Sequence, residues 1–372
     1  MDVDVRQKGN RFDLKVAGAD IFFEVANHDC PPDVSADFAV WAALPFAMRR
    51  GEKLHVRGRV DPVSLANAHE LSRIWSMWVP EAYTPIEVTA DEVAVTPAAP
   101  SEDGVLLFSG GVDSTFALLE NLEAARLTSV LTVHGLDYSH DDTDAINALL
   151  GKTQPLLDRH GLNRIVVRTN IGPTMRQPGL THGFMLATCL FLFNGGFRQG
   201  HIAADITPPQ DFLTFPWGTN HITNDLFAAS HYGMRTLGQK TSRIRKLDAL
   251  REDAVAMSAI SFCAARKMRP HNCGVCSKCV RTKLMMIALT GSCPDIFLDT
   301  KITDKQIRQI DAHSNKSFRF EILQTARERG HLDKLGALEQ HMQRGIRATR
   351  RRAATARVMK RIRHIGSKLL PF

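Results

Sequence analysis

The sequence predicts an α/β protein in which a parallel β-sheet is covered by helices on both faces, preceded by a small α+β domain. Between residues 104 and 206, short apolar segments typical of buried strands alternate with longer segments of helical periodicity. Such alternation implies right-handed crossovers between parallel strands. Before residue 96, apolar and polar positions alternate as they do in half-buried strands.

The composition supports a globular chain. The 372 residues are 44% hydrophobic and 23% charged, which is enough to build a core in each of two domains. The longest nearly apolar stretch, residues 183–193, is shorter than the ~20 residues of a membrane span, and we interpret it as a buried helix. The first ten residues are charged and lack the apolar run of a secretory signal, so we expect no transmembrane segment and a cytoplasmic protein.

Residues 1–95 are expected to form the small α+β domain. Their alternating segments predict strands, and one segment between them has helical spacing. The predicted strands are 12–16, 20–26, 53–60 and 86–95, and the predicted helix is 62–78. Residues 96–104 contain two prolines, small residues and charges, so we place a linker there.

Strands and helices are expected to alternate after the linker. The segments are 104–108, 115–127, 129–135, 144–161, 164–170, 182–197 and 201–206. We assign residues 105–292 to one ligand-binding domain, 293–340 to a helical C-terminal region and 341–372 to a basic tail. The tail carries ten Lys and Arg and no acidic residue, so the remainder of the chain sums to −2 although the net charge is +8.

The segment SGGVDS, residues 109–114, lies in a strand-to-helix turn, at the sheet edge where open α/β proteins bind ligands. Gly110 and Gly111 permit tight backbone conformations, and the hydroxyls of Ser109 and Ser114 can donate hydrogen bonds. The positive end of the following helix favours an anion. The segment therefore predicts a phosphate cradle, although a turn that merely caps the helix is the alternative. The GxxxxGK[ST] order is absent.

This loop resembles the signature of the PP-loop ATP pyrophosphatases, which implies a Rossmann-like fold of the adenine nucleotide alpha hydrolase type. It also implies that ATP is cleaved between its α and β phosphates while a substrate oxygen is adenylated. The resemblance places the pyrophosphate portion, with Mg²⁺, on Ser109, Gly110, Gly111, Val112, Asp113 and Ser114. Ser109 and Asp113 are then the catalytic candidates, and Asp113 either places Mg²⁺ or orients the loop.

A group of cysteines predicts a metal site. Cys273, Cys276 and Cys279 are each separated by two residues, a spacing that allows thiolates to surround one tetrahedral Zn²⁺. Cys263 is the candidate for the fourth ligand, and His271 is the alternative. An iron–sulfur cluster is less favoured, because a closed set of four ligands fits structural zinc directly.

The loop and the cysteines together are similar to the 7-cyano-7-deazaguanine synthase branch of the PP-loop enzymes, over residues 104–292. Members convert a carboxylate to an adenylate, then with ammonia to an amide and a nitrile, and they carry structural zinc. Here the gap from Cys263 to Cys273 is longer, and residues 204–227 do not resemble the substrate-recognition segment of that branch. The resemblance thus implies an ATP-dependent, C–N bond-forming ligase acting on a small carboxylate with ammonia or an amine. Two alternatives are sulfur or nitrogen transfer to tRNA, and a zinc-stabilised nucleotide-binding module without turnover.

Further site candidates follow predicted strands. His134, Asp137 and Asp205 come at strand ends, where ligands bind in such sheets. Asp205 is a candidate to bind metal or orient ammonia, or it simply caps a turn.

Asn220, His221 and Asp225 occupy a polar loop that can fold over a substrate.

A basic run holds the last candidates, Lys240, Arg243, Arg245 and Lys246, one of which can neutralise charge on departing pyrophosphate, unless the run is a solvated surface. The basic tail is a candidate to bind RNA or an anionic membrane, or it is a solvated extension.

Overall fold

The structure is a computed structural model. It describes residues 1–30, 35–175, 177–309 and 316–344, together with residues 347, 351 and 355. The chain divides into two compact units, residues 1–272 and 273–372. Among the described residues, no helix is both long and apolar enough to cross a membrane.

The first unit is built on one ten-stranded sheet, in the order β10-β9-β6-β7-β8-β3-β2-β1-β4-β5. The strands are β1 (Asp2–Lys8), β2 (Arg11–Val16), β3 (Ala19–Ala26), β4 (Leu54–Val60), β5 (Val88–Val93), β6 (Gly104–Leu107), β7 (Leu127–His134), β8 (Asn163–Thr169), β9 (Gln199–Ala203) and β10 (Met234–Leu237). The strands from β10 to β8 in this order are all parallel, which confirms the predicted parallel sheet of an α/β protein.

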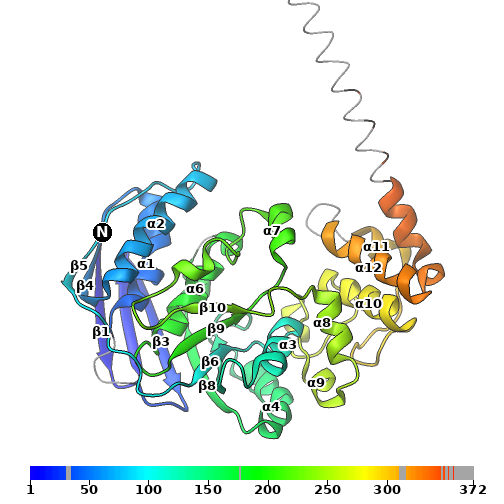
Figure 1. The fold of residues 1–372 in the computed structure, drawn as a ribbon, viewed down its shortest axis with the longest axis horizontal. Coiled ribbons are helices and arrows are strands. Elements are labelled where there is room, and N and C mark those ends of the chain that lie inside the picture. The colour runs from blue at the N-terminus through cyan, green and yellow to red at the C-terminus, as the bar shows by residue number, and fades with distance from the viewer. Residues whose placement is uncertain are drawn as a thin grey trace, which may run out of the picture. The chain divides into compact units, whose positions relative to one another are not determined.

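Helices cover both faces of the parallel strands, as predicted. The helices of this unit are α1 (Asp37–Arg50), α2 (Pro62–Trp78), α3 (Val112–Asn121), α4 (Thr143–Arg159), α5 (Ile171–Thr174), α6 (Pro178–Phe191), α7 (Pro208–Thr214), α8 (Arg243–Leu250) and α9 (Ala254–Ala259), with short 3-10 turns η1 (Asn224–Leu226) and η2 (Arg266–Met268). Helix α1 packs with α6 and with α2, while α3 packs with α8 and α4 with α9 (Figure 1).

The strand order places a topological switch point beside β6. From β6 the chain moves outward to β7 and β8, then returns across the sheet through α6 to β9 on the other side of β6. In open α/β sheets, ligands bind outside the carboxyl ends of the strands at such a switch point. Any ligand site of this sheet is expected there.

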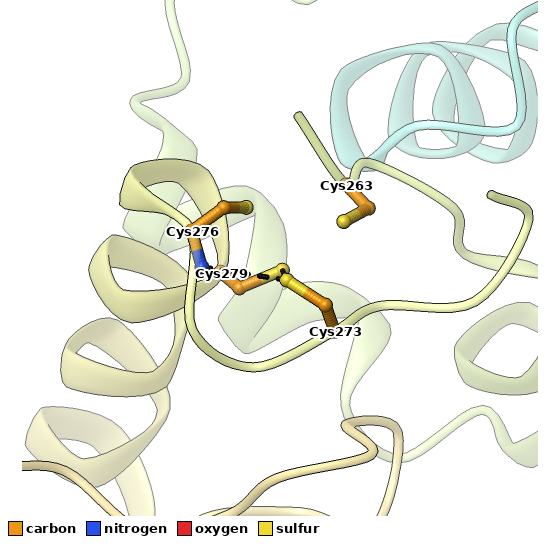
Figure 2. A group of neighbouring side chains, drawn as sticks. All are labelled: Cys263, Cys273, Cys276 and Cys279. Carbon is orange, nitrogen blue, oxygen red and sulfur yellow. Dashed lines mark hydrogen bonds between the residues drawn. The ribbon is translucent and has the colours of Figure 1, made fainter. Parts of the chain in front are cut away.

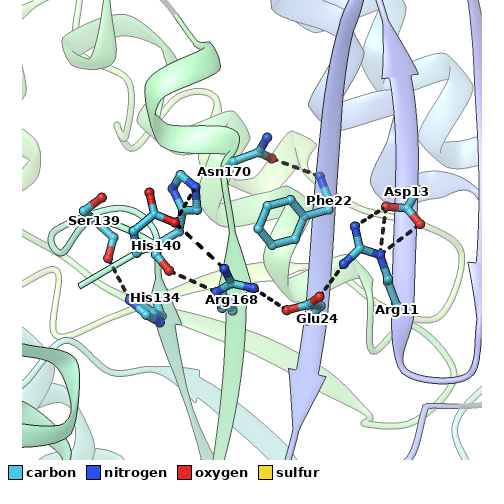
Figure 3. A network of polar contacts seen from close by, with 10 residues as sticks. Arg11, Asp13, Phe22, Glu24, His134, Ser139, His140, Arg168 and Asn170 are labelled. Carbon is cyan, nitrogen blue, oxygen red and sulfur yellow. Dashed lines mark hydrogen bonds and ion pairs between the residues drawn. The ribbon is translucent and has the colours of Figure 1, made fainter. Parts of the chain in front are cut away.

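The N-terminal strands continue the same sheet. Strand β3 pairs antiparallel with β8, with Val25 opposite Val167. Figure 3 shows the polar contacts across this seam: Arg168 donates to Glu24 at 2.7 Å, and the ring of Phe22 lies between two guanidinium groups, those of Arg11 and Arg168. The predicted strands and the helix at 62–78 are present in this region.

Two N-terminal elements, β1 and α1, were not expected from the sequence. Helix α1 is buried on nearly every side, from Phe38 through Met48, so its residues lack the polar stripe that reveals a surface helix. Helix α2 does show conventional signals, since the side chain of Asp61 caps its first turn and Pro62 follows.

The second unit contains α10 (Ser277–Thr290), α11 (Asp304–Gln309), α12 (Lys316–Arg329) and η3 (Leu332–Leu335). Helix α10 packs against α12, α11 and η3. Of these elements, α11, α12 and η3 lie within residues 293–340.

Candidate functional site

The SGGVDS segment connects β6 to α3 at the switch point. Gly110 has φ +70°, and a Cβ there would lie 2.9 Å from Cγ2 of Thr153, so the turn needs glycine on both conformational and steric grounds. The Ser109 and Ser114 hydroxyls lie 3.4 Å apart, and Ser114 Oγ donates to Gly111 O at 3.2 Å. The loop is held tightly by its own polar atoms.

Helix α3 begins without a side-chain cap. Its N-cap residue is Gly111, and no side chain of the described residues bonds to the first turn as a cap. The sequence analysis left open a loop whose side chains only cap the helix. These residues do not form such a cap. Uncapped first-turn N–H groups and the helix dipole together favour a bound anion.

Asp113 forms a buried ion cluster. Arg243 donates to both of its carboxylate oxygens, and Lys246 Nζ lies 3.2 Å from Oδ1. Burial opposes ionisation of Asp113, but the charges and hydrogen bonds of the two cations outweigh it and lower the pKa. Of the two roles considered for Asp113, this geometry favours orienting the loop over holding Mg²⁺.

Lys246 joins this cluster to the end of β9. Its side chain is 1% exposed, and Nζ also donates to the carbonyl oxygen of Ala204. Arg243 and Lys246, two of the four residues in the predicted basic run, thus contact Asp113 of the SGGVDS loop. Lys240 is exposed, and Arg245 is exposed with Asp248 at 3.9 Å.

Asp205, which follows β9, is part of the same electrostatic group. Trp217 Nε1 donates to its Oδ2 at 2.9 Å. Burial raises the pKa of Asp205, the charge of His182 lowers it, and the nearby negative charge of Asp113 raises it further. Burial lowers the pKa of His182, whose Nε2 lies 2.8 Å from the Thr219 hydroxyl. The sequence did not indicate His182 or Trp217.

The three candidates in the polar loop have different surroundings. Asn220 is buried and braces the loop, with its amide donating to Trp217 O and the Thr223 hydroxyl. Asp225 lies on the surface, where it pairs with Arg235 at 3.1 Å. His221 pairs with Asp211, a residue that the sequence did not single out.

The two candidates after β7 have local structural partners. His134 Nε2 lies 2.7 Å from Ser139 O, and burial lowers its pKa. Asp137 forms an ion pair with Arg269 at 3.3 Å. Neither contact involves a residue of the SGGVDS loop.

The four cysteines form a compact group. The sulfurs of Cys263, Cys273, Cys276 and Cys279 all lie within 4.8 Å of one another (Figure 2). Tetrahedral thiolate coordination at a Zn–S distance of ~2.3 Å requires sulfurs ~3.8 Å apart, and the sulfurs of Cys273 and Cys279 are separated by 3.9 Å. The backbone N–H of Cys276 donates to Cys273 Sγ at 3.3 Å, which stabilises a thiolate.

This group can therefore hold a metal ion. Cys263 is the fourth member, as the sequence analysis favoured, and His271, the alternative, is exposed and outside the group. The basic tail lies outside the described residues apart from its first four residues and residues 347, 351 and 355.

Comparison of the chain with protein-family models, with curated proteins and with solved structures finds no match in any of the three.

Proposed function

We propose that the protein is an ATP-dependent ligase of the PP-loop type, which adenylates a carboxylate and transfers the acyl group to ammonia or an amine. The observation that carries this proposal is the uncapped glycine turn at the switch point with two buried cations beside it, Arg243 and Lys246. A site with positive charge and a helix start that lacks a side-chain cap suits the triphosphate of ATP. The SGGVDS sequence supplies the specific resemblance to PP-loop enzymes.

In the proposed reaction, a carboxylate oxygen of the substrate attacks the α phosphorus of ATP. The bond from that phosphorus to the bridging oxygen breaks, and pyrophosphate leaves with the electron pair. Charge builds on the departing pyrophosphate, next to the loop amides, Arg243 and Lys246. These groups are fixed before the reaction, so their stabilisation of that charge requires little reorganisation.

The carboxylate of Asp205 is the group in this site most suited to Mg²⁺, because both oxygens of Asp113 are engaged by cations. A divalent ion bound with ATP would supply charge neutralisation on the phosphates. It would also compensate the burial that disfavours ionised Asp205.

The cysteine group is proposed to hold structural Zn²⁺. Four thiolate ligands close the coordination sphere and leave no open position for substrate, so the expected contribution is to folding. No step of the proposed reaction uses this metal.

The test is pyrophosphate release from the purified chain with ATP, Mg²⁺ and a panel of carboxylic acids. Ser109→Ala removes one loop hydroxyl, and Lys246→Met removes one buried cation. We expect each to slow acid-dependent release about 100-fold, the usual scale for loss of one preorganised donor. Lys240→Met, in the same basic run but exposed, is the matched control and should keep the wild-type rate.

Two results would count against the proposal. One is release from the wild type that no acid stimulates. The other is acid-dependent release that survives both substitutions with its rate unchanged.

A further inference from the structure

The loop between β9 and β10 contains a buried carboxylate–imidazole pair. Asp211 is 3% exposed, and the side chain of His221 is 15% exposed. The Asp211 Oδ2 atom accepts the backbone N–H of His221 at 2.9 Å and contacts Nδ1 of the same residue. The two groups are thus fixed to each other by both main chain and side chain.

This geometry sets the tautomer of His221. Oδ2 of Asp211 accepts the backbone N–H of His221 and lies against Nδ1, so Nδ1 of the imidazole carries the proton and donates it. Nε2 is then left with a lone pair. Within the described part of the chain, Nε2 of His221, Oδ1 of Asp211 and Nε2 of Gln210 are buried and meet no hydrogen-bond partner. Three such polar atoms in one loop indicate a polar ligand.

The loop lies at the same sheet edge as the proposed adenylation site. Trp217, four residues before His221, donates to Asp205 at the end of β9. On the other side of His221, Asn224 donates to the Thr236 hydroxyl on β10 at 3.0 Å. The segments on either side of His221 are therefore tied to Asp205, just after β9, and to Thr236 on β10.

We propose that His221 is the general base of the second step, with Asp211 as its positioning residue. This inference rests on the proposed ligase function. The amine nitrogen attacks the acyl carbon, an N–C bond forms, and the C–O bond to AMP breaks with its electron pair leaving on AMP. One proton of the attacking nitrogen passes to Nε2 of His221. Asp211 stabilises the resulting imidazolium through Nδ1.

Separate measurement of the two steps tests the assignment. In His221→Ala, we expect the amine-dependent step to fall about 100-fold or more, the usual scale for loss of a general base. Pyrophosphate release in the absence of amine should change much less. Asp211→Asn should also slow the amine step, because the amide no longer fixes the tautomer. The exposed His231, changed to Ala, is the control.

The pH profile and chemical rescue distinguish a base from a structural residue. The amine step of the wild type should rise with pH as a single group loses its proton, and His221→Ala should lose that limb. Added imidazole should restore part of its rate. An amine step that is unaffected in His221→Ala, while adenylation proceeds, overturns the inference and leaves the ligase proposal standing. No acid-dependent pyrophosphate release from the wild type overturns both.

A second measurement does not depend on the substrate. In protein labelled with ¹⁵N-histidine, long-range ¹H–¹⁵N spectra should show that the neutral ring of His221 carries its proton on Nδ1, and the signal should disappear in His221→Ala. A neutral ring with its proton on Nε2 would rule out this role for His221.

Discussion

Replacing Asp113 with Asn should destabilise the first unit severely. The substitution keeps the shape of the side chain and removes its charge. Arg243 and Lys246 would then be left as two buried cations, with side chains 13% and 1% exposed, facing an amide. An uncompensated charge inside a protein is far more costly than a buried pair, because nothing replaces the lost hydration.

The expected loss is about 3–5 kcal/mol, the range measured when one partner of a buried ion pair is removed. For a unit of this size, each kcal/mol lowers Tm by roughly 2–4 °C, so a decrease of about 6–20 °C should follow. The control is Asp225→Asn, which removes the partner of Arg235 where the side chains are 65% and 50% exposed. A surface ion pair contributes about 0–1 kcal/mol to the free energy of unfolding, so the Tm of that variant should be close to the Tm of the wild type.

Tryptophan fluorescence during urea or thermal unfolding reports on the correct unit, because Trp41, Trp75, Trp78 and Trp217 all precede residue 273. The pH dependence gives a second signature. The pKa of Asp113 is lowered in the folded state, so its contribution is present above its unfolded pKa, about 3.9, and is lost as pH falls through the folded value. The difference in the free energy of unfolding between the wild type and Asp113→Asn should be constant from pH 5 to 8 and should become smaller in stronger acid. Equal midpoints for the two proteins at pH 7 would show that the cluster does not stabilise the fold.

Two further predictions concern the cysteines and a buried histidine. Purified protein should contain about one zinc per chain by elemental analysis, and Cys276→Ser should lower both the zinc content and Tm. Cys30→Ser, which lies outside the group, should change neither. A metal-free wild type with an unchanged Tm would contradict this prediction. Burial lowers the pKa of His201 to about 4, so the unfolded chain binds more protons than the folded chain between pH 6.5 and 4, and the free energy of unfolding should decline as pH falls across that window. In His201→Gln, urea midpoints measured across the same window should decline less steeply. A slope equal to that of the wild type would refute this prediction.

The local elements around the site could be predicted from the sequence, because the patterns that indicate them involve residues close together in the chain. The apolar run at 104–108, the glycines after it and the helical pattern from 115 give a strand, turn and helix in sequence, and the structure has β6, the loop and α3 there. The CxxCxxC spacing likewise indicates a shared metal before any fold is known, because three thiolates so close in sequence can meet at one ion.

The partners of Asp113 were harder to predict from the sequence, because they are 130 and 133 residues away in the chain. The basic run at 240–246 was visible, but sequence gives no way to tell the inward side chains of Arg243 and Lys246 from the exposed Lys240 and Arg245. Helix α8 makes that selection: positions 243 and 246 are three apart and share the face that packs on α3, while 245 points to solvent.

The role of Asp211 could not be predicted from the sequence for a different reason. Asp211 follows two prolines and precedes an exposed Phe212, so its surroundings in the sequence are those of an ordinary surface turn. Its role depends on the chain returning ten residues later to bring His221 beside it. A histidine in a polar loop suggests chemistry, but only the fold identifies the carboxylate that sets its tautomer.

The charges at the switch point suggest why a costly ion cluster is placed there. Asp113, Arg243 and Lys246 together carry one net positive charge, and their position is fixed by α3, α8 and the end of β9. Without Asp113, two buried cations would repel each other and the loop would lose its anchor. With it, the cations stay charged and oriented, and they remain available to a phosphate that approaches the uncapped start of α3. A single carboxylate can thus stabilise the fold and also keep two cations charged beside the SGGVDS loop.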